Sequence, residues 1–185
     1  MGMFVYKMFD KGLKCRGYQF KVGVNECEHA TCVREGFHAA ENPLDCLSYY
    51  PNFDESECWL CYADGDIHED GSDSKISCTR LEILRPLDKF NFVYEAVRYI
   101  LEHPKRELNH LVQSERGTAD ENGFVIVKGR APVARGNKDC DVLAWLVEDE
   151  FGVIYDSGVT LVSQTAELPG KWYDIFGKEW VAPCD

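Results

Sequence analysis

Short strand-like runs separated by turn residues recur along the chain, and this spacing constrains the fold more than any other feature. The runs at residues 15–22 and 75–84 alternate apolar with polar side chains, which is typical of strands with one buried face. The later runs are more continuously apolar, with Gly- and Asp-containing turns between them, such as residues 156–158. The runs occupy residues 4–9, 15–22, 59–67, 75–84, 124–127, 141–147, 152–155 and 159–162. We therefore expect β-sheet in both halves of the chain.

Helical periodicity is confined to the first 115 residues. Apolar side chains at Val93, Ala96, Val97, Ile100 and Leu101 follow the spacing of one helix face, and a proline at 104 ends the pattern. An asparagine at 42 can cap a short helix whose first position is a proline. A weaker helical pattern covers residues 108–112.

These patterns together predict an α+β fold in two modules. The first module, residues 1–115, is expected to be an acidic α+β domain with a mixed sheet and two or three helices. The second, residues 120–185, is expected to be a small all-β module.

The composition is that of a folded globular protein, with 45% hydrophobic and 12% aromatic residues among 185. No run approaches the ~20 apolar residues that a membrane helix needs, and the first residues lack the pattern of a secretory signal. The nine cysteines are an odd number, which argues against a disulfide framework. We expect a soluble, cytoplasmic protein with reduced thiols and no membrane partner.

The whole formal charge of −12 lies in residues 26–73, which hold 13 acidic residues and a single basic one, Arg34. Such a surface repels phosphates, so we expect no direct nucleic-acid binding, and it attracts a basic protein surface. The alternative is an acidic face that only keeps the protein soluble. The candidate partner-binding residues are Asp54, Glu55, Glu57, Asp64, Asp66, Glu69, Asp70 and Asp73, with Trp59 and Tyr62 as aromatic anchors.

Two cysteine pairs, Cys27 with Cys32 and Cys58 with Cys61, have spacings found in metal sites, and together they could form a four-thiolate zinc site. The second pair, however, lies in a strand-like run, where residues three apart face opposite sides. The acidic run at 64–73 suggests a calcium loop, but Ser77 stands where a bidentate glutamate is required. We predict no metal and no cofactor, with zinc at the four cysteines as the open alternative.

Several segments resemble a domain of unknown function that recurs in bacteriophage and prophage proteins. The resemblance implies a phage or mobile-element protein that acts in the cytoplasm of a bacterial host, and it is nearly silent on activity. The segments that carry it are Tyr6–Asp10, Leu13–Phe20, Gly36–His38, Glu41–Asp45, Tyr49–Tyr50, Cys58–Ala63 and Ser77–Ile83, and in the C-terminal module Val142–Val147 and Lys171–Tyr173.

A more distant resemblance is to the ADP-ribosyltransferases, carried by a strand at Gly36–His38 that runs into a short helix ending at Tyr50. It implies an early polar residue that holds a nicotinamide dinucleotide and a late glutamate that stabilises the ribosyl cation. Arg16 and Glu82 match these roles, with His38 near the cleft. Each has a structural alternative, respectively a surface ion pair, an outward strand position and a half-buried imidazole.

Three classes of function follow from these features. We expect a phage or mobile-element accessory protein that binds a basic partner through its acidic surface. Such a protein would inhibit a host nucleic-acid-binding defence complex by mimicking nucleic acid, as an anti-CRISPR protein does. The alternatives are an ADP-ribosyltransferase-like enzyme and a structural or virion accessory protein whose edge strands pair with other chains. We expect binding rather than catalysis.

Overall fold

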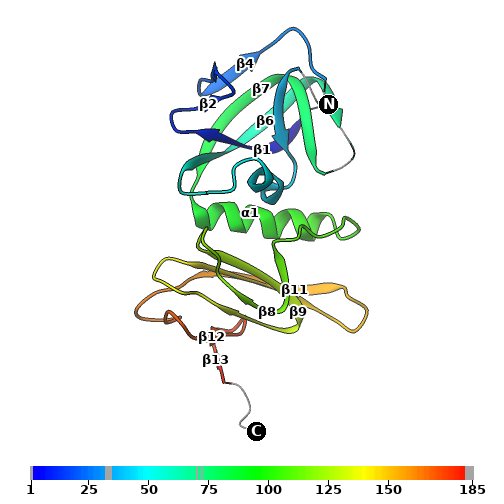
Figure 1. The fold of residues 1–185 in the computed structure, drawn as a ribbon. Helices are drawn as coiled ribbons and strands as arrows, with labels where there is room; N and C mark the ends of the chain where they lie inside the picture. The colour runs from blue at the N-terminus through cyan, green and yellow to red at the C-terminus, as the bar shows by residue number, and fades with distance from the viewer. Residues whose placement is uncertain (1, 32–34, 70, 72, 182–185) are drawn as a thin grey trace. The chain divides into compact units, whose positions relative to one another are not determined.

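The computed structural model describes residues 2–31, 35–69, 71 and 73–181. They fold into two compact units, Met1–Asp88 and Lys89–Asp185, and each has its own sheet and its own buried core (Figure 1). Within the described residues, no helix combines the length and the apolar character needed to cross a membrane.

The described part of the first unit contains seven strands in one antiparallel sheet. Three of them are long, and β6 and β7 form a hairpin. The short β4 and β5 pair with β7, and the small β2–β3 hairpin pairs with the end of β1. The strands are β1 (Met3–Asp10), β2 (Lys14–Cys15), β3 (Tyr18–Gln19), β4 (Gly23–Glu26), β5 (Phe37–Ala40), β6 (Ser56–Glu69) and β7 (Lys75–Leu87).

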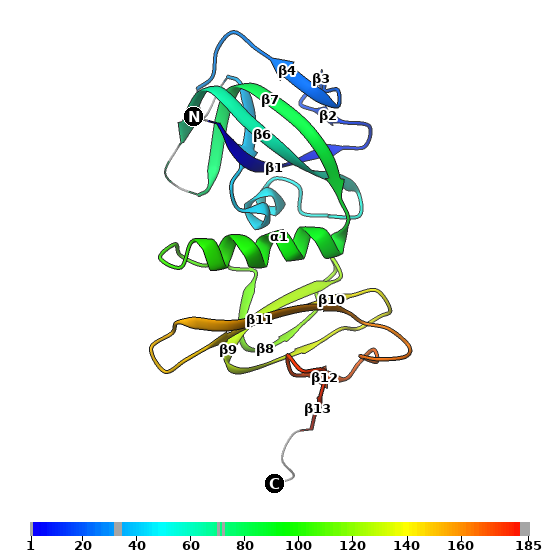
Figure 2. The same ribbon diagram turned by 180° about the vertical axis from the view of Figure 1, so that it is seen from behind.

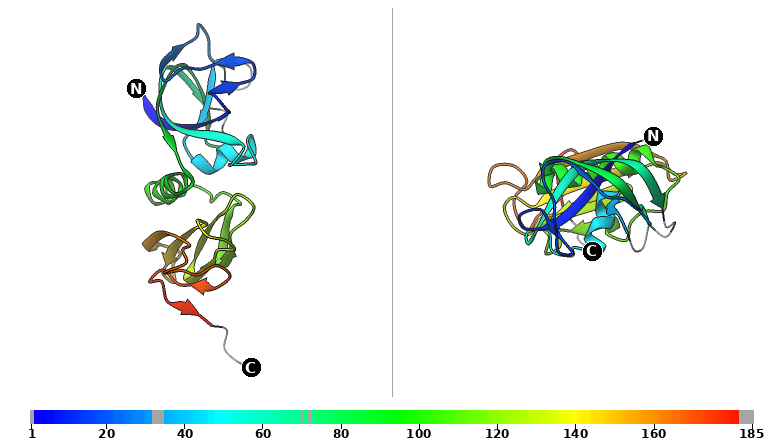
Figure 3. Two further views of the ribbon diagram at one scale, coloured as in Figure 1. Left: turned by 90° about the vertical axis from the view of Figure 1, so that its left-hand side faces the viewer. Right: turned by 90° about the horizontal axis from the view of Figure 1, so that it is seen from above.

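Four of these strands close into a ring in the order β1, β6, β7, β5 and back to β1. β5 completes the ring because Phe37 pairs with Cys78 of β7 while Ala40 pairs with Tyr6 of β1. Figure 3 shows the first-unit strands curving around a common interior. Apolar side chains fill that interior, namely Val5, Phe9, Phe20, Phe37, Ala39, Cys61, Ala63, Ile76, Cys78, Leu81 and Ile83.

A short 3-10 helix, η1 (Pro43–Ser48), follows β5, and the prediction that Asn42 caps it is confirmed. The Asn42 side-chain oxygen accepts a hydrogen bond from the Leu44 N–H at 3.1 Å. Ser74, just before β7, accepts from the Asn42 N–H at 2.8 Å and donates its hydroxyl to Asp45 at 2.6 Å. These bonds fix η1 against the start of β7.

The second unit consists of one helix and a six-stranded sheet. β10 and β8 pair in parallel with β9, and β11 and β12 add antiparallel strands (Figure 2). The helix packs on β9, β10 and β11. The elements are α1 (Lys89–Glu102), β8 (Val112–Thr118), β9 (Phe124–Arg135), β10 (Val142–Glu148), β11 (Ile154–Leu161), β12 (Trp172–Tyr173) and β13 (Glu179–Trp180).

The predicted amphipathic helix is confirmed as α1, which buries Val93, Ala96, Val97 and Ile100. Leu101, placed on the same face by its spacing, is 40% exposed.

The predicted fold class, an α+β fold with two or three helices in the N-terminal module, is wrong. Strands account for 50% of the described residues and helices for 11%, so the described structure is mainly β. Two helices are described: η1 is six residues of 3-10 helix, and α1 belongs to the second compact unit. The described part of residues 120–185 contains strands and no helix.

Long-range pairing explains the differences in detail. The segment 108–112, with its weak helical pattern, leads into β8, because Val112 pairs with Ile126 of β9. Residues 156–158, predicted as a turn, lie inside β11, because Ser157 pairs with Leu146 of β10. The boundary between the compact units lies after Asp88, whereas the sequence patterns placed the two modules at residues 1–115 and 120–185.

Replacing Asn42 by Ala should lower the free energy of unfolding of the first unit by about 1–2 kcal/mol, because the buried Leu44 N–H loses its acceptor. Ser48→Ala, at an exposed position of the same helix, should cost less than about 0.5 kcal/mol. Urea unfolding followed by hydrogen exchange in peptides from residues 1–88 measures both. Equal losses in the two variants would contradict the capping role.

Candidate functional site

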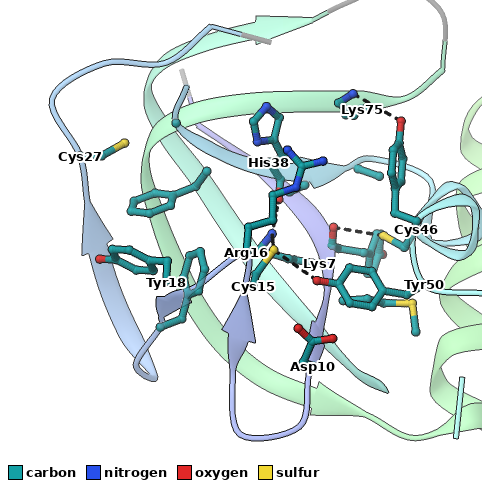
Figure 4. A pocket seen from close by; sticks show the side chains of 18 residues that line it. Lys7, Asp10, Cys15, Arg16, Tyr18, Cys27, His38, Cys46, Tyr50 and Lys75 are labelled. Atoms are coloured by element: carbon teal, nitrogen blue, oxygen red, sulfur yellow. Dashed lines mark hydrogen bonds between the residues drawn. The ribbon is translucent and has the colours of Figure 1, made fainter. Parts of the chain in front are cut away.

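The candidate site is a cleft where β1 and β5 separate. Beyond the pair Tyr6↔Ala40, β5 continues along β7 while β1 continues to its pairing with β2. The opening has a volume of about 710 Å³, within the usual range for small-molecule sites. Its lining comes from β1, the β2–β3 hairpin, β5 and the end of η1, and includes Lys7, Asp10, Cys15, Arg16, Tyr18, Phe20, Phe37, His38, Tyr49, Tyr50 and Lys75 (Figure 4).

Lys7 is the most unusual residue of this cleft. Strand alternation places it on the same face of β1 as Val5 and Phe9, toward the ring interior, and it is only 5% exposed. Its ammonium donates to the His38 carbonyl oxygen at 2.7 Å and lies 5.1 and 5.3 Å from the ring centroids of Phe9 and Phe20. No carboxylate of the described residues forms an ion pair with it. A buried cation without a carboxylate partner is costly, so its retention is a functional signal.

Cys15 lies beside this ammonium and receives a second hydrogen-bond donor. The Lys7 Nζ is 3.7 Å from the Cys15 Sγ, and the Tyr50 hydroxyl donates to the same sulfur at 3.2 Å. Burial, and next the hydrogen bond to Cys15, raise the pKa of Tyr50, so the phenol keeps its proton and remains a donor. Figure 4 shows Tyr50 and Lys7 both directed at Cys15.

The charge inside the cleft is opposite to that of the unit around it. Residues 1–88 carry nine Lys and Arg against sixteen Asp and Glu. The cleft, in contrast, is lined by Lys7, Arg16 and Lys75 with one carboxylate, Asp10. Arg16 has a φ of 47° in the two-residue turn between β2 and β3, a conformation that costs a side-chain-bearing residue about 1–2 kcal/mol.

Aromatic rings form two walls of the cleft. Tyr18, Phe20 and Phe37 make one cluster, with centroid separations of 4.6, 5.1 and 5.4 Å. Tyr49 and Tyr50 at the end of η1 also line it, and the Lys75 ammonium lies 5.1 Å from the Tyr49 ring centroid. Such walls suit a flat ring, and the cations suit an anion.

Of the three catalytic candidates from the sequence, the cleft brings together Arg16 and His38. Glu82 does not line it. It lies on β7 opposite Val24 of β4 and Tyr62 of β6.

The sequence interpretation missed Lys7, Cys15 and Tyr50. Lys7 had a signal, because a lysine at the centre of the apolar run Phe4–Phe9 must be buried if that strand is central to a sheet. Cys15 and Tyr50 had none, since their contact joins residues 35 positions apart.

The predicted partner-binding carboxylates that the structure describes do not line the cleft, and three of them make contacts within the first unit. Glu57 accepts from the Gly12 N–H, Asp64 lies 3.7 Å from Arg80, and Asp73 accepts from the Lys75 N–H. Asp54, Glu55, Asp66 and Glu69 are exposed, and Asp70 lies outside the described residues.

The two predicted aromatic anchors are half-buried. Trp59 packs against the interior cluster, and Tyr62 makes an edge contact with Phe4 at a centroid distance of 5.3 Å. Phe4 itself is 57% exposed, so the exposed aromatic surface beside β6, the strand that carries several of these carboxylates, belongs largely to β1.

The remaining thiols of the first unit are mostly buried. Burial raises the pKa of Cys46 and of Cys78 to about 12 and also raises those of Cys58 and Cys61, while the nearby Lys7 charge acts in the opposite direction on Cys46, Cys61 and Cys78. Within the described residues, which omit Cys32, no three His, Cys, Asp or Glu side chains come together as a metal site.

These thiols predict an alkaline loss of stability. The folded unit retains protons that the unfolded chain releases near pH 9, so the free energy of unfolding should fall as pH rises from about 9 to 12. The double variant Cys46→Ala/Cys78→Ala should show a shallower fall than the wild type, and Cys140→Ala, at an exposed position, an unchanged one. Urea unfolding at several pH values measures the slopes, and equal slopes in all three proteins would refute the assignment.

Residues 3–95 match the model of a family described as a domain of unknown function (DUF7666). The match covers β1 to β7 and half of α1, and therefore contains the whole cleft. Neither a curated protein nor a solved structure matches the chain.

Proposed function

We propose that this chain, which belongs to the DUF7666 family, binds a small anionic ligand with a flat ring, of the nucleotide class, in the cleft between β1 and β5. The observation that carries the proposal is the buried Lys7 ammonium without a carboxylate partner in the described structure. An anionic group in the cleft would supply the missing counter-charge in a site of low dielectric, where such a pairing is strong.

The other cations support the same ligand class. Arg16 lies at the mouth of the cleft, and its planar guanidinium can hold a phosphate through two parallel hydrogen bonds. Its strained backbone is of the kind that structures retain where a side chain has a function. The cluster of Tyr18, Phe20 and Phe37 offers ring faces and edges against which a base can pack.

The resemblance to ADP-ribosyltransferases supports the binding of a dinucleotide in this proposal, but not the transfer of its ribosyl group. A nicotinamide dinucleotide belongs to the proposed ligand class, and Arg16 and His38 both line the cleft. Cleavage of its ribosyl bond, however, calls for a carboxylate beside the developing cation. Since Glu82 does not line the cleft, ribosyl transfer through Glu82 is not part of the proposal.

Lys7→Met should weaken the binding of adenosine diphosphate about tenfold or more, because it removes the buried charge but keeps the shape. Arg16→Gln, at an exposed position, should weaken it as well, and Lys21→Met, which removes a charge elsewhere on the same unit, should not. Isothermal titration at low and moderate salt measures the dissociation constants.

The matched probes are adenosine, which lacks phosphate, and pyrophosphate, which lacks the ring. Both should bind more weakly than the diphosphate. If the wild type binds none of the three at millimolar concentration, the nucleotide assignment is wrong.

A second candidate function is the binding of a basic partner protein by the acidic surface, as an accessory protein of phage or mobile-element origin would do when it inhibits a host nucleic-acid-binding complex. The supporting observation is that Glu55, Asp66 and Glu69 are exposed and form no ion pair within the described structure. Such carboxylates act on a partner over a Debye length of about 8–10 Å.

The double variant Asp66→Lys/Glu69→Lys should abolish co-purification of a basic partner, because it reverses the attracting charge without disturbing buried groups. Glu107→Lys/Glu121→Lys makes the same charge change at exposed positions of the second unit and serves as the control. Quantitative mass spectrometry of purifications at low and moderate salt compares the variants. Loss of the partner in both variants would indicate a general charge effect and count against this surface.

A further inference from the structure

The Cys15 sulfur is the one nucleophilic atom that the described cleft surrounds with two hydrogen-bond donors. The Lys7 ammonium lies 3.7 Å from it and the Tyr50 hydroxyl 3.2 Å, and Cys15 is a half-buried residue that lines the cleft. An adjacent cation and a hydrogen-bond donor both stabilise negative charge on sulfur. Lys7 is held in place by the His38 carbonyl and by the rings of Phe9 and Phe20, so this arrangement is fixed before any ligand arrives.

The other described thiols of the first unit lack this combination. Cys46, Cys58, Cys61 and Cys78 are buried, and burial raises their pKa, which favours the inert thiol. Cys27 is half-buried and also lines the cleft, but its sulfur lies against the backbone carbonyls of His29, Cys78 and Thr79, and burial raises its pKa as well. Cys140 of the second unit is exposed, and among the described residues no cation or phenol hydrogen-bonds to its sulfur. Cys15 therefore differs from Cys140 in the two hydrogen-bond donors beside its sulfur, and not only in its solvent exposure.

We propose that Cys15 is a nucleophile that attacks a small anionic electrophile in the cleft. The preference for a negative charge rests on the proposed function, because it comes from the same Lys7 and Arg16 cations that would hold a nucleotide. The reactivity of the sulfur itself goes beyond that function.

The chemical step is a substitution at carbon. The Cys15 proton passes to solvent through the open cleft, and the sulfur lone pair forms a bond to the electrophilic carbon. The bond from that carbon to its leaving group breaks, and the leaving group departs with both electrons. Lys7 and Tyr50 lie beside the sulfur and can stabilise negative charge that develops on it, and Arg16 and Lys75 attract the anionic part of the electrophile.

Iodoacetate and iodoacetamide test this proposal, because they react by the same step, release the same iodide and differ in charge. Peptide mapping by mass spectrometry gives the alkylation rate at each cysteine of the full chain. The ratio of the iodoacetate rate to the iodoacetamide rate should be about tenfold higher at Cys15 than at Cys140. A ratio at Cys15 equal to or below that at Cys140 would overturn the proposal.

Three variants separate the contributions. Lys7→Met should bring the ratio at Cys15 down to that at Cys140, and Lys21→Met should leave it unchanged. Tyr50→Phe removes a neutral donor, so it should slow both reagents and preserve the ratio. If Lys7→Met does not fold, Arg16→Gln takes its place and should lower the ratio. A ratio that stays the same in the folded variant of this pair would overturn the proposal.

The alkylation experiment and the nucleotide-binding experiment can fail independently of each other. If adenosine diphosphate binds while Cys15 shows no preference for iodoacetate, the nucleophile is refuted and the proposed function stands. If Cys15 shows the preference while no nucleotide binds, the nucleophile is supported and the nucleotide assignment fails.

Discussion

The pairing of β5 with both β7 and β1 is the constraint from which the rest of the first unit follows. It closes four strands into a ring, so every second side chain of β1 must face a common interior. Because β5 meets β1 at the single pair Tyr6↔Ala40, the two strands then separate. The β2–β3 hairpin and η1 flank this separation without filling it, which leaves the cleft.

The closed ring also determines the electrostatics of the cleft. Lys7 occupies an interior position between Val5 and Phe9, where a charge loses its hydration. One backbone carbonyl and two aromatic rings offset part of that cost, and the described structure offers no carboxylate to offset the rest. A positive potential therefore persists in a unit whose surface is acidic. The two proposals, anion binding in the cleft and a nucleophilic Cys15, both rest on this charge.

Charges of opposite sign thus occupy separate parts of the first unit. The exposed carboxylates Asp66 and Glu69 lie toward the end of β6, whereas Lys7 and Arg16 face the cleft from β1 and the β2–β3 turn. A ligand in the cleft and a basic protein on the acidic surface would use different residues. The two proposed functions are consequently independent, and variants of one surface leave the other intact.

The parts of the structure that the sequence predicted are those governed by neighbouring residues. The cap at Asn42 and the helix α1 were both visible as local spacing or capping chemistry. The fold class was wrong because weak helical patterns, such as that at residues 108–112, were overridden by strand pairing with distant residues. Of the site, the sequence singled out Arg16 and His38, but it placed Glu82 with them and missed Lys7.

By itself, the sequence therefore determined which segments form the main strands and where α1 lies. It also determined that the net acidic charge is concentrated in residues 26–73. Only the tertiary structure decided that Lys7 is buried, that Cys15 meets Tyr50, and that Glu82 stands apart from the cleft. The physical reason is range. Helical and strand periodicity depends on residues a few positions apart, whereas the hydrogen bonds Lys7–His38, Tyr50–Cys15 and Cys78–Phe37 join residues that are 31 to 41 positions apart in the chain.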